Sequence, residues 1–202
     1  MLAHSLEAFE AVDAIDAIVV VTTDDLIAQA RDLAKAVSPK TTSVIAGGAT
    51  RDASTRAALE VTPDPDGKIL VHDAARPLIA PATIAACVAA LDRFDAVGVA
   101  VPSADTLLAV DAGRVTGIPD RSHLWQAQTP QGFRVDILRR AHAAAAADPA
   151  FTPTDDCGVV ARYLTGVTIG VVAGEPSNVK ITYPEDLAVA EALWHRNQAH
   201  TD

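Results

Sequence analysis

The sequence predicts an α/β fold, in which a mostly parallel, Rossmann-like sheet carries helices on both faces and a β-arm protrudes from it. Short apolar runs rich in β-branched residues alternate with stretches whose apolar residues recur every three or four positions, which is the pattern of strand and helix in turn. The strand runs are apolar throughout, as expected of parallel strands that are covered on both faces. We expect residues 1–202 to form one domain, with residues 106–133 as the arm and its return to the sheet.

The first half of the chain is expected to alternate helix and strand. Apolar residues at positions 2, 6 and 9 predict a helix ahead of the first strand, and Asp24 is a candidate cap for the helix that follows that strand and ends before Pro39. Pro81 is expected to open a further helix at its first position. Strands are expected at residues 15–21, 44–46, 69–71 and 97–101, with a helix at residues 51–60.

The second half begins with the arm. Residues 107–110 and 115–118 flank Asp111-Ala112-Gly113, which is typical of a hairpin turn. Beyond the arm the periodicity predicts helices at residues 135–146, 155–164 and 184–195 and a strand at residues 167–172.

Composition excludes several classes of function. The 26 acidic and 16 basic residues give a net charge of −10, which opposes sequence-independent binding of nucleic acid. No apolar run approaches the roughly 18 residues that cross a bilayer, and no basic segment precedes an apolar one at the start, so we expect a cytoplasmic protein without a membrane partner. Cys87 and Cys157 form no C-x-x-C pair and are expected to be free thiols.

The strongest candidate site is His-Asp-Ala-Ala-Arg-Pro at residues 72–77, directly after a predicted strand. In a doubly wound sheet, ligands bind beyond the carboxyl ends of the strands. Asp73 could ligate Mg²⁺ and Arg76 could bind a phosphate through its fork of N–H groups. An internal ion pair or a simple turn would explain the same pattern, and that alternative stays open.

Other polar residues follow strands or lie in the arm. Gly47-Gly48, with Arg51 and Ser54 on the next turn, could bind a polar ring or sugar or form a tight turn. Lys180 could be a site cation or a solvated lysine, and Thr154-Asp155-Asp156 could contact a ligand or supply the cap and acidic first turn of a helix. Thr106, Arg121 and Thr129 offer hydroxyls and a cation, or are surface residues. G-x-G-x-x-G, G-x-x-x-x-G-K-[ST], H-E-x-x-H and G-x-S-x-G are all absent, which removes the usual support for dinucleotide, P-loop, zinc and serine-nucleophile sites.

Five blocks in order resemble the 2-C-methyl-D-erythritol 4-phosphate cytidylyltransferases. They are Val-His-Asp-Ala-Ala-Arg-Pro at residues 71–77, Asp105-Thr106, Gln-Thr-Pro-Gln-Gly-Phe at residues 128–133, Thr-Asp-Asp at residues 154–156, and Asn-Val-Lys-Ile-Thr through Pro-Glu-Asp-Leu at residues 178–187. The resemblance runs nearly end to end. Sister ribitol 5-phosphate cytidylyltransferases share much of it, but Ala74-Ala75 is more similar to the erythritol enzymes.

The resemblance implies a fold of the nucleotide-diphospho-sugar transferase type and a homodimer that exchanges β-arms. It implies transfer of a cytidylyl group from CTP to 2-C-methyl-D-erythritol 4-phosphate, in the non-mevalonate isoprenoid pathway. By position, Asp73 would ligate Mg²⁺ and Lys180 would steady the phosphate charge, and these two would be the catalytic residues. Gly48, Ala49 and Ser54 would border the nucleotide, Arg76, Thr129 and Thr154 would bind the sugar phosphate, and Thr106 and Arg121 would reach the partner's site.

This sequence departs from the family pattern at the N-terminus. The family opens with a strand, a glycine-rich CTP loop and a Pro-Lys pair, all before the helix that here includes residues 4–6, so the resemblance implies an N-terminally truncated domain. We therefore expect negligible pyrophosphate release by the chain as written, and the strands at residues 15–21 and 69–71 should either face a gap or pair directly. Three interpretations stay open: a truncated active enzyme, a short paralogue that keeps the sugar-phosphate and dimer surfaces without catalysis, and an unrelated Rossmann-like dehydrogenase, which the missing cofactor fingerprint opposes.

Overall fold

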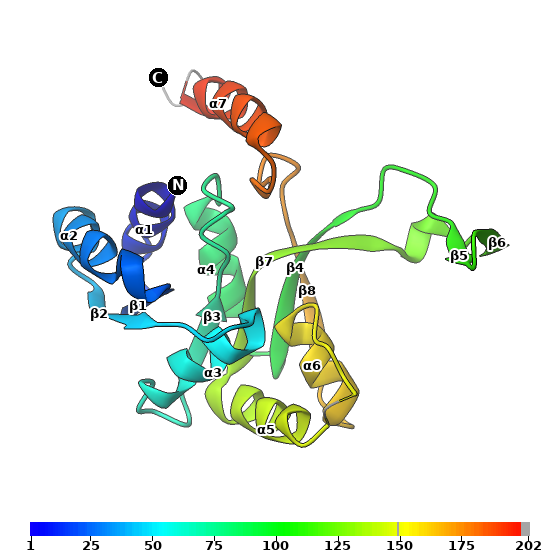
Figure 1. Ribbon diagram of the computed structural model, residues 1–202, viewed down its shortest axis with the longest axis horizontal. Coiled ribbons are helices and arrows are strands. Elements are labelled where there is room, and N and C mark those ends of the chain that lie inside the picture. The colour runs from blue at the N-terminus through cyan, green and yellow to red at the C-terminus, as the bar shows by residue number, and fades with distance from the viewer. Residues whose placement is uncertain (149, 199–202) are drawn as a thin grey trace.

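The computed structural model describes residues 1–148 and 150–198. Its strands form three groups (Figure 1). The first is a parallel pair, β1 (Ile18–Thr22) and β2 (Thr41–Ala46). The second is a four-stranded sheet in the order β3 (Lys68–Val71), β7 (Trp125–Arg134), β4 (Ala96–Pro102) and β8 (Ile169–Ala173). The third is the hairpin of β5 (Ala109–Asp111) and β6 (Arg114–Gly117).

Seven α-helices lie within the described residues: α1 (Leu2–Glu10), α2 (Ile27–Val37), α3 (Arg51–Glu60), α4 (Pro81–Ala90), α5 (Val135–Ala146), α6 (Asp156–Tyr163) and α7 (Pro184–Gln198). The expected bounds of α3 and α5 are confirmed, as is Pro81 at the first position of α4. The capping role expected for Asp24 is wrong, because Thr23 precedes a 3₁₀ turn, Asp24–Leu26, in which Asp24 is the first residue. None of these helices is long and apolar enough to cross a membrane.

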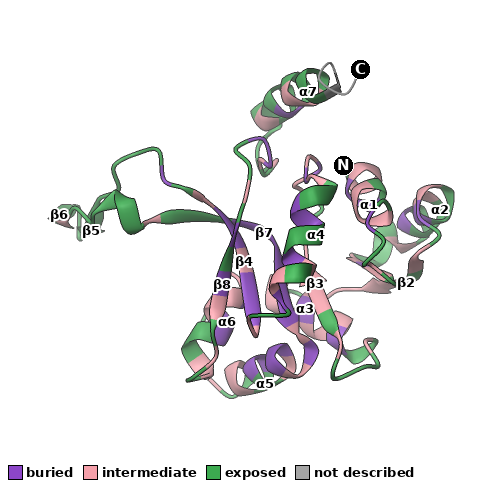
Figure 2. Ribbon diagram, turned by 180° about the vertical axis from the view of Figure 1, so that it is seen from behind, coloured by how far each residue is buried: buried purple, intermediate pink, exposed green. Residues whose placement is uncertain are grey.

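The α/β class with helices on both faces of the sheet is confirmed. Helix α4 packs on one face of the four-stranded sheet, where Val97 and Val99 of β4 meet Cys87 and Leu91. Helices α5 and α6 cover the opposite face, where their apolar residues surround Phe133 of β7. Figure 2 shows buried residues concentrated in these strands, whereas the arm is exposed.

Strand β7 is the main difference from the expected topology. We expected these residues only as the return of the arm, but they form a ten-residue central strand, antiparallel to both β3 and β4. Its Pro, Gly and Ala residues are depleted in ordinary strands, and it has no sustained apolar alternation, which explains why the sequence pattern did not reveal it. The register with β4 shifts between Gly98 and Ala100, beside the cis bond of Thr129-Pro130. This irregularity lies where β7 carries two polar site residues, Gln128 and Thr129.

Of the two outcomes expected for the first and third strands, direct pairing is wrong. Strand β1 pairs with β2 and β3 pairs with β7, and no pairing joins β1 to β3 in the part of the chain that the structure describes. The β1–β2 pair has its own apolar cluster with α1 and α2, around Leu6 and Val20. The molecule therefore consists of a small and a large layered unit, with α3 in contact with β1, β2 and α5.

Candidate functional site

Asp73 forms the centre of the candidate site. It lies two residues beyond the end of β3, and its Oδ2 accepts a hydrogen bond from Lys180 Nζ at 2.9 Å. Lys180 comes from the loop after β8, so two predicted site residues that are 107 positions apart meet at one sheet edge. On the other side of the carboxylate, Arg51 Nε lies 3.5 Å from Oδ1. The carboxylate thus stands between two cations.

These cations keep Asp73 ionised. Burial by itself would raise the pKa of this carboxyl group, but the hydrogen bond and charge of Lys180, followed by the charges of Arg51 and Arg76, outweigh it and hold the pKa below its ordinary value. Asp73 is therefore an anion that can accept further positive charge through its remaining lone pairs.

His72 fixes the turn that carries Asp73. Burial lowers the pKa of His72 to about 4, so its imidazole is neutral at pH 7. Its Nε2 lies 3.1 Å from the carbonyl oxygen of Arg76, which can only accept, so Nε2 carries the proton and Nδ1 accepts from Thr129 Oγ1 at 3.0 Å. Thr129 Oγ1 in turn accepts the backbone N–H of Asp73 at 3.1 Å. These bonds tie the loop after β3 to β7.

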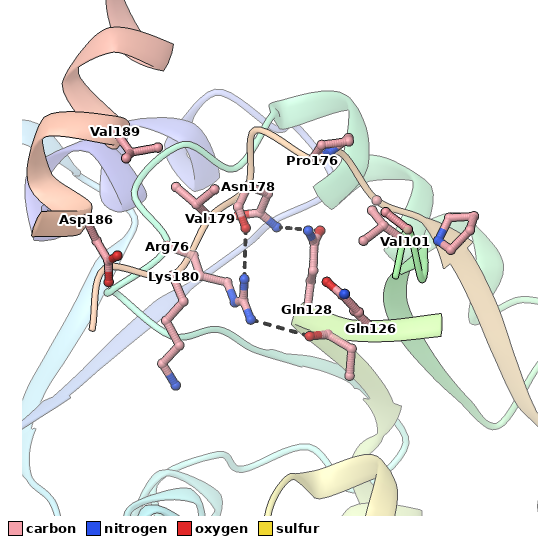
Figure 3. Close-up of a pocket in the computed structure, with 14 residues that line it drawn as sticks. Arg76, Val101, Gln126, Gln128, Pro176, Asn178, Val179, Lys180, Asp186 and Val189 are labelled. Atoms are coloured by element: carbon pink, nitrogen blue, oxygen red, sulfur yellow. Dashed lines mark hydrogen bonds between the residues drawn. The ribbon is translucent and has the colours of Figure 1, made fainter. Parts of the chain in front are cut away.

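Arg76 lines a cavity of about 680 Å³ next to this cluster, and Lys180 lines it too. Figure 3 shows Arg76 between the chain at Asn178 and strand β7. Its Nη1 donates to Asn178 O at 2.8 Å and its Nη2 to Ala127 O at 3.4 Å, while its buried Nε has no hydrogen-bond partner among the described residues. Burial lowers the pKa of Arg76, and the charge of Asp73 offsets part of this effect. These two hydrogen bonds use two of the five N–H groups of a guanidinium that lines a cavity, which suits an anionic ligand.

Asn178 holds the wall of this cavity. It is fully buried, and its side-chain amide donates to Thr129 O at 2.9 Å and to Gln128 Oε1 at 3.2 Å. The loop that carries Lys180 is thereby attached to β7, and its backbone meets the Asp73 turn through the N–H of Ile181, which donates to Ala75 O at 2.8 Å.

The loop after β2 forms a second border of the site. Gly48 N donates to Ser54 Oγ at 3.2 Å, and the side chain of Thr50 caps α3 by accepting from Ala53 N at 3.3 Å. A Cβ atom added to Gly48 would collide with Ala53, so only glycine allows this loop to pass so close to the helix. Gly48, Ala49 and Ser54 therefore lie at the carboxyl end of β2, and Arg51 on the same helix connects this loop to Asp73.

Three predicted residues are not joined to the Asp73 cluster. Thr106 is exposed in the arm, and Arg121 donates from Nη1 to Ala104 O at 2.8 Å. Arg121 lines a second cavity of about 410 Å³ that shares Pro102 and Ala104 with the Arg76 cavity. Thr154 is exposed and precedes Asp155, whose Oδ1 caps α6 through Gly158 N at 2.7 Å. The described residues show no hydrogen bond from these three side chains to Asp73, Arg76 or Lys180.

Two residues behind Asp73 have partners that the sequence did not predict. Arg51 was expected, with Gly47-Gly48 and Ser54, beside a polar ring or sugar, but it pairs with Asp73 and Asp156. Asp156 was expected as an acidic residue in the first turn of a helix, and it lies there after the cap Asp155; it is also fully buried, with Oδ2 accepting from Arg51 Nη1 at 2.7 Å. No spacing in the sequence signals this contact between residues 105 positions apart.

Comparison with known proteins gives one consistent result. The family model described as 2-C-methyl-D-erythritol 4-phosphate cytidylyltransferase matches residues 1–196. The protein of that name from Thermobifida fusca is 48% identical over 201 residues, which cover 96% of this chain and 81% of the relative. The protein of the same name from Geotalea uraniireducens is 41% identical and covers 96% of this chain and 83% of the relative.

Solved structures agree with the sequence matches. The 4-diphosphocytidyl-2C-methyl-D-erythritol synthase from Anaerococcus prevotii superposes with a TM-score of 0.90 at 28% identity, covering 96% of this chain and 85% of that one. The 2-C-methyl-D-erythritol 4-phosphate cytidylyltransferase from Thermus thermophilus gives a TM-score of 0.74 at 31% identity, covering 94% and 86%.

Proposed function

This chain belongs to the 2-C-methyl-D-erythritol 4-phosphate cytidylyltransferase family, and we propose that it transfers a cytidylyl group from CTP to 2-C-methyl-D-erythritol 4-phosphate with release of pyrophosphate. The observation that supports this most directly is the meeting of Asp73 with Lys180 and Arg51 beside the cavity that Arg76 lines. Phosphoryl-group transfer needs mainly positioning and cations around developing charge, and this edge of the sheet supplies both.

In the proposed reaction, a phosphate oxygen of methylerythritol phosphate attacks the α-phosphorus of CTP, and the bond from that phosphorus to the oxygen of the leaving pyrophosphate breaks. Arg76 would bind the sugar phosphate with Thr129, and Lys180 would balance the negative charge shared by the two phosphates. Gly48, Ala49 and Ser54 would border cytosine and ribose. Thr154 stays a predicted substrate contact.

A divalent cation fits the donor set on the carboxylate side. Mg²⁺ is commonly held by one or two carboxylates together with substrate phosphates and water. Asp73 is one ionised carboxylate with lone pairs to spare, and no group of three or more His, Cys, Asp or Glu side chains that could hold a metal by itself occurs in residues 1–148 and 150–198. Bound there with the nucleotide, Mg²⁺ would neutralise part of the triphosphate charge, while Lys180 would be free to turn from Asp73 to a phosphate.

The proposal extends to a homodimer and a cytoplasmic location. The arm exposes large apolar side chains, which is costly in water unless another surface covers them; they are Leu107, Leu108, Val110, Val115 and Ile118. In a dimer that exchanges arms, Thr106 and Arg121 would reach the partner's site instead of their own. The cytoplasmic location stays a prediction.

Calorimetric titration of the chain with methylerythritol phosphate tests the assignment. We expect binding, and we expect Arg76→Ala to weaken it about 10- to 100-fold, since hydrogen bonds to charged groups contribute roughly 1.5–3 kcal/mol. Arg140→Ala is the matched control, because Arg140 is an exposed arginine that pairs with Asp136 on α5. Equal binding by wild type and Arg76→Ala would contradict the assignment.

Ribitol 5-phosphate, titrated in the same way, separates the sister activity from the proposed one. We expect weaker binding of ribitol 5-phosphate than of methylerythritol phosphate. Pyrophosphate release is measured in parallel with CTP and Mg²⁺, and any release must depend on methylerythritol phosphate; release that continues without it would count against transfer.

A further inference from the structure

A chain of hydrogen-bonded and charged side chains lies behind Asp73, on the side away from Lys180. His142 of α5 donates from Nε2 to Asp156 Oδ1 at 3.0 Å, and Asp156 Oδ2 accepts from Arg51 Nη1 at 2.7 Å. Arg51 then reaches Asp73 Oδ1 through Nε at 3.5 Å. The side chains of His142 and Asp156 are only 2% and 1% exposed, so this chain runs from the interior to the site.

We propose that the buried His142–Asp156 pair, acting through Arg51, positions the Asp73 carboxylate for the metal and nucleotide. His142, Asp156 and Arg51 are positioning residues in this account, and Asp73 is the group that touches the ligand. The inference rests on the proposed function of Asp73.

The rigidity of Asp156 supports this role. Both of its carboxylate oxygens are engaged, and its backbone N–H donates to Gln131 Oε1 at 3.1 Å. Gln131 also accepts from Cys157 N at 3.1 Å and donates to Asp155 Oδ2 at 2.7 Å. The first turn of α6 is therefore bound to the central strand β7, and Asp156 has little freedom to rotate.

The planar guanidinium of Arg51 links the fixed Asp156 carboxylate to Asp73. A guanidinium is planar and its donors keep a fixed relation to one another, so an anchor at Nη1 also fixes the direction of Nε. A lysine at the same position would place one ammonium group near one carboxylate and could not hold both in this geometry. Arg51 therefore joins the buried pair to the site carboxylate as a rigid spacer.

The energetics favour a positioning role over a purely structural one. Burial would raise the pKa of Asp156, but the hydrogen bond from His142 and the charge of Arg51 outweigh it and keep the carboxylate ionised. A buried ion pair usually adds no net stability over well-packed apolar residues of the same volume. Groups that orient a metal ligand from behind, by contrast, typically change metal affinity or activity about 10- to 100-fold when removed.

Arg51→Lys and Asp156→Asn test the proposal, with Arg56→Lys as the matched control. Arg56 lies on the same helix and pairs with Asp52, away from Asp73. Calorimetry measures CTP binding with and without Mg²⁺, and thermal unfolding without ligands reports the fold. We expect both test variants to weaken the Mg²⁺-dependent binding of CTP about 10- to 100-fold and the control to change it less than twofold.

Each outcome decides a separate question. If Asp156→Asn folds and its Mg²⁺-dependent binding of CTP is unchanged, the inference is overturned. If Asp156→Asn does not fold, the same comparison is made with Arg51→Lys, which keeps the positive charge. A wild type without Mg²⁺-dependent CTP binding overturns the proposed function instead. If the wild type shows no such binding, a crystal structure of metal-free Arg51→Lys still tests the positioning. We expect the Asp73 carboxylate to rotate or to occupy more than one orientation in this variant. A carboxylate in the same position as in the wild type would refute its positioning by Arg51.

Discussion

The His72 imidazole accepts a hydrogen bond from the Thr129 hydroxyl only in its neutral form. Once protonated, Nδ1 would become a donor, and the Thr129 hydroxyl would have to turn its proton away from the ring and accept from both Nδ1 and the N–H of Asp73. The ring also lies against Phe9, with centroids 5.3 Å apart, which limits access of water to the charged form. The turn that carries Asp73 therefore depends on the protonation state of a neighbour that takes no part in binding.

This dependence predicts how stability changes with acid. The pKa of His72 is about 4 in the folded chain against an ordinary value of 6.5, so the unfolded chain binds the proton more tightly. The stabilisation from a neutral His72 is complete above pH 6.5 and is lost as the pH falls toward 4, and it amounts to about 3 kcal/mol. Urea unfolding of the metal-free protein across this range measures it.

The control for this prediction is a pair of glutamine variants. We expect His72→Gln to flatten the rise in unfolding free energy between pH 4 and 6.5, while His195→Gln, at an exposed histidine, keeps the wild-type slope. Parallel slopes for all three proteins would show that the buried ring does not titrate as described.

Among single residues, sequence reasoning identified those in the loops that follow strands. Asp73 and Lys180 meet because the carboxyl ends of β3 and β8 lie at one edge of the sheet. Arg51 and Asp156 were missed in their roles because a contact between two side chains on different helices leaves no periodic pattern. The roles of Thr106 and Arg121 depend on a second copy of the chain and stay predictions.

At the scale of elements, the loop between β2 and α3 has almost no room for substitution. Gly48→Ala would place a methyl group against Ala53, and the first turn of α3 would have to move, taking Arg51 with it. We expect a loss of about 1–3 kcal/mol in unfolding free energy from overpacking, together with weaker CTP binding. Chemical unfolding and calorimetry measure the two effects.

Gly117→Ala is the matched control, because an added Cβ there meets only Ala109, at an ordinary 3.9 Å. We expect this variant to keep both stability and affinity. An equal loss in the two variants would mean that any alanine in place of these glycines is harmful and that the contact with α3 is not the cause.

Helices were predicted more closely than strands, for a physical reason. Helices α3 and α5 carry their periodicity within one local segment, and their bounds were right. Strand β7 owes its place to partners on both sides, β3 and β4, which hold a polar, proline-containing segment in the middle of a sheet. Tertiary pairing overrides local preference there, and no local pattern could reveal it.

At the scale of the whole molecule, the arm is the feature that most needs a partner. A two-stranded hairpin is marginal by itself, and this one is solvated on both faces. We expect the chain to sediment as a dimer at micromolar concentration and Ile118→Asp to shift it toward monomer, since Ile118 is 65% exposed in a single chain. Val171→Asp, at a residue 62% exposed on β8, serves as the control in analytical ultracentrifugation. A monomeric wild type would contradict the exchange of arms.

The division of the strands into two sheets has a consequence for how the chain responds to ligands. The β1–β2 unit has its own small core around Leu6 and Val20, and a second apolar cluster around Val12 and Ile84 attaches it to the larger unit, so opening of the smaller half has to break that cluster. Arg51, on the helix that follows β2, forms ion pairs with Asp73 and Asp156 of the larger unit. A nucleotide that contacts Gly48 and Asp73 together would bind only while the two units are in place. Its binding free energy would therefore also stabilise the smaller unit against opening.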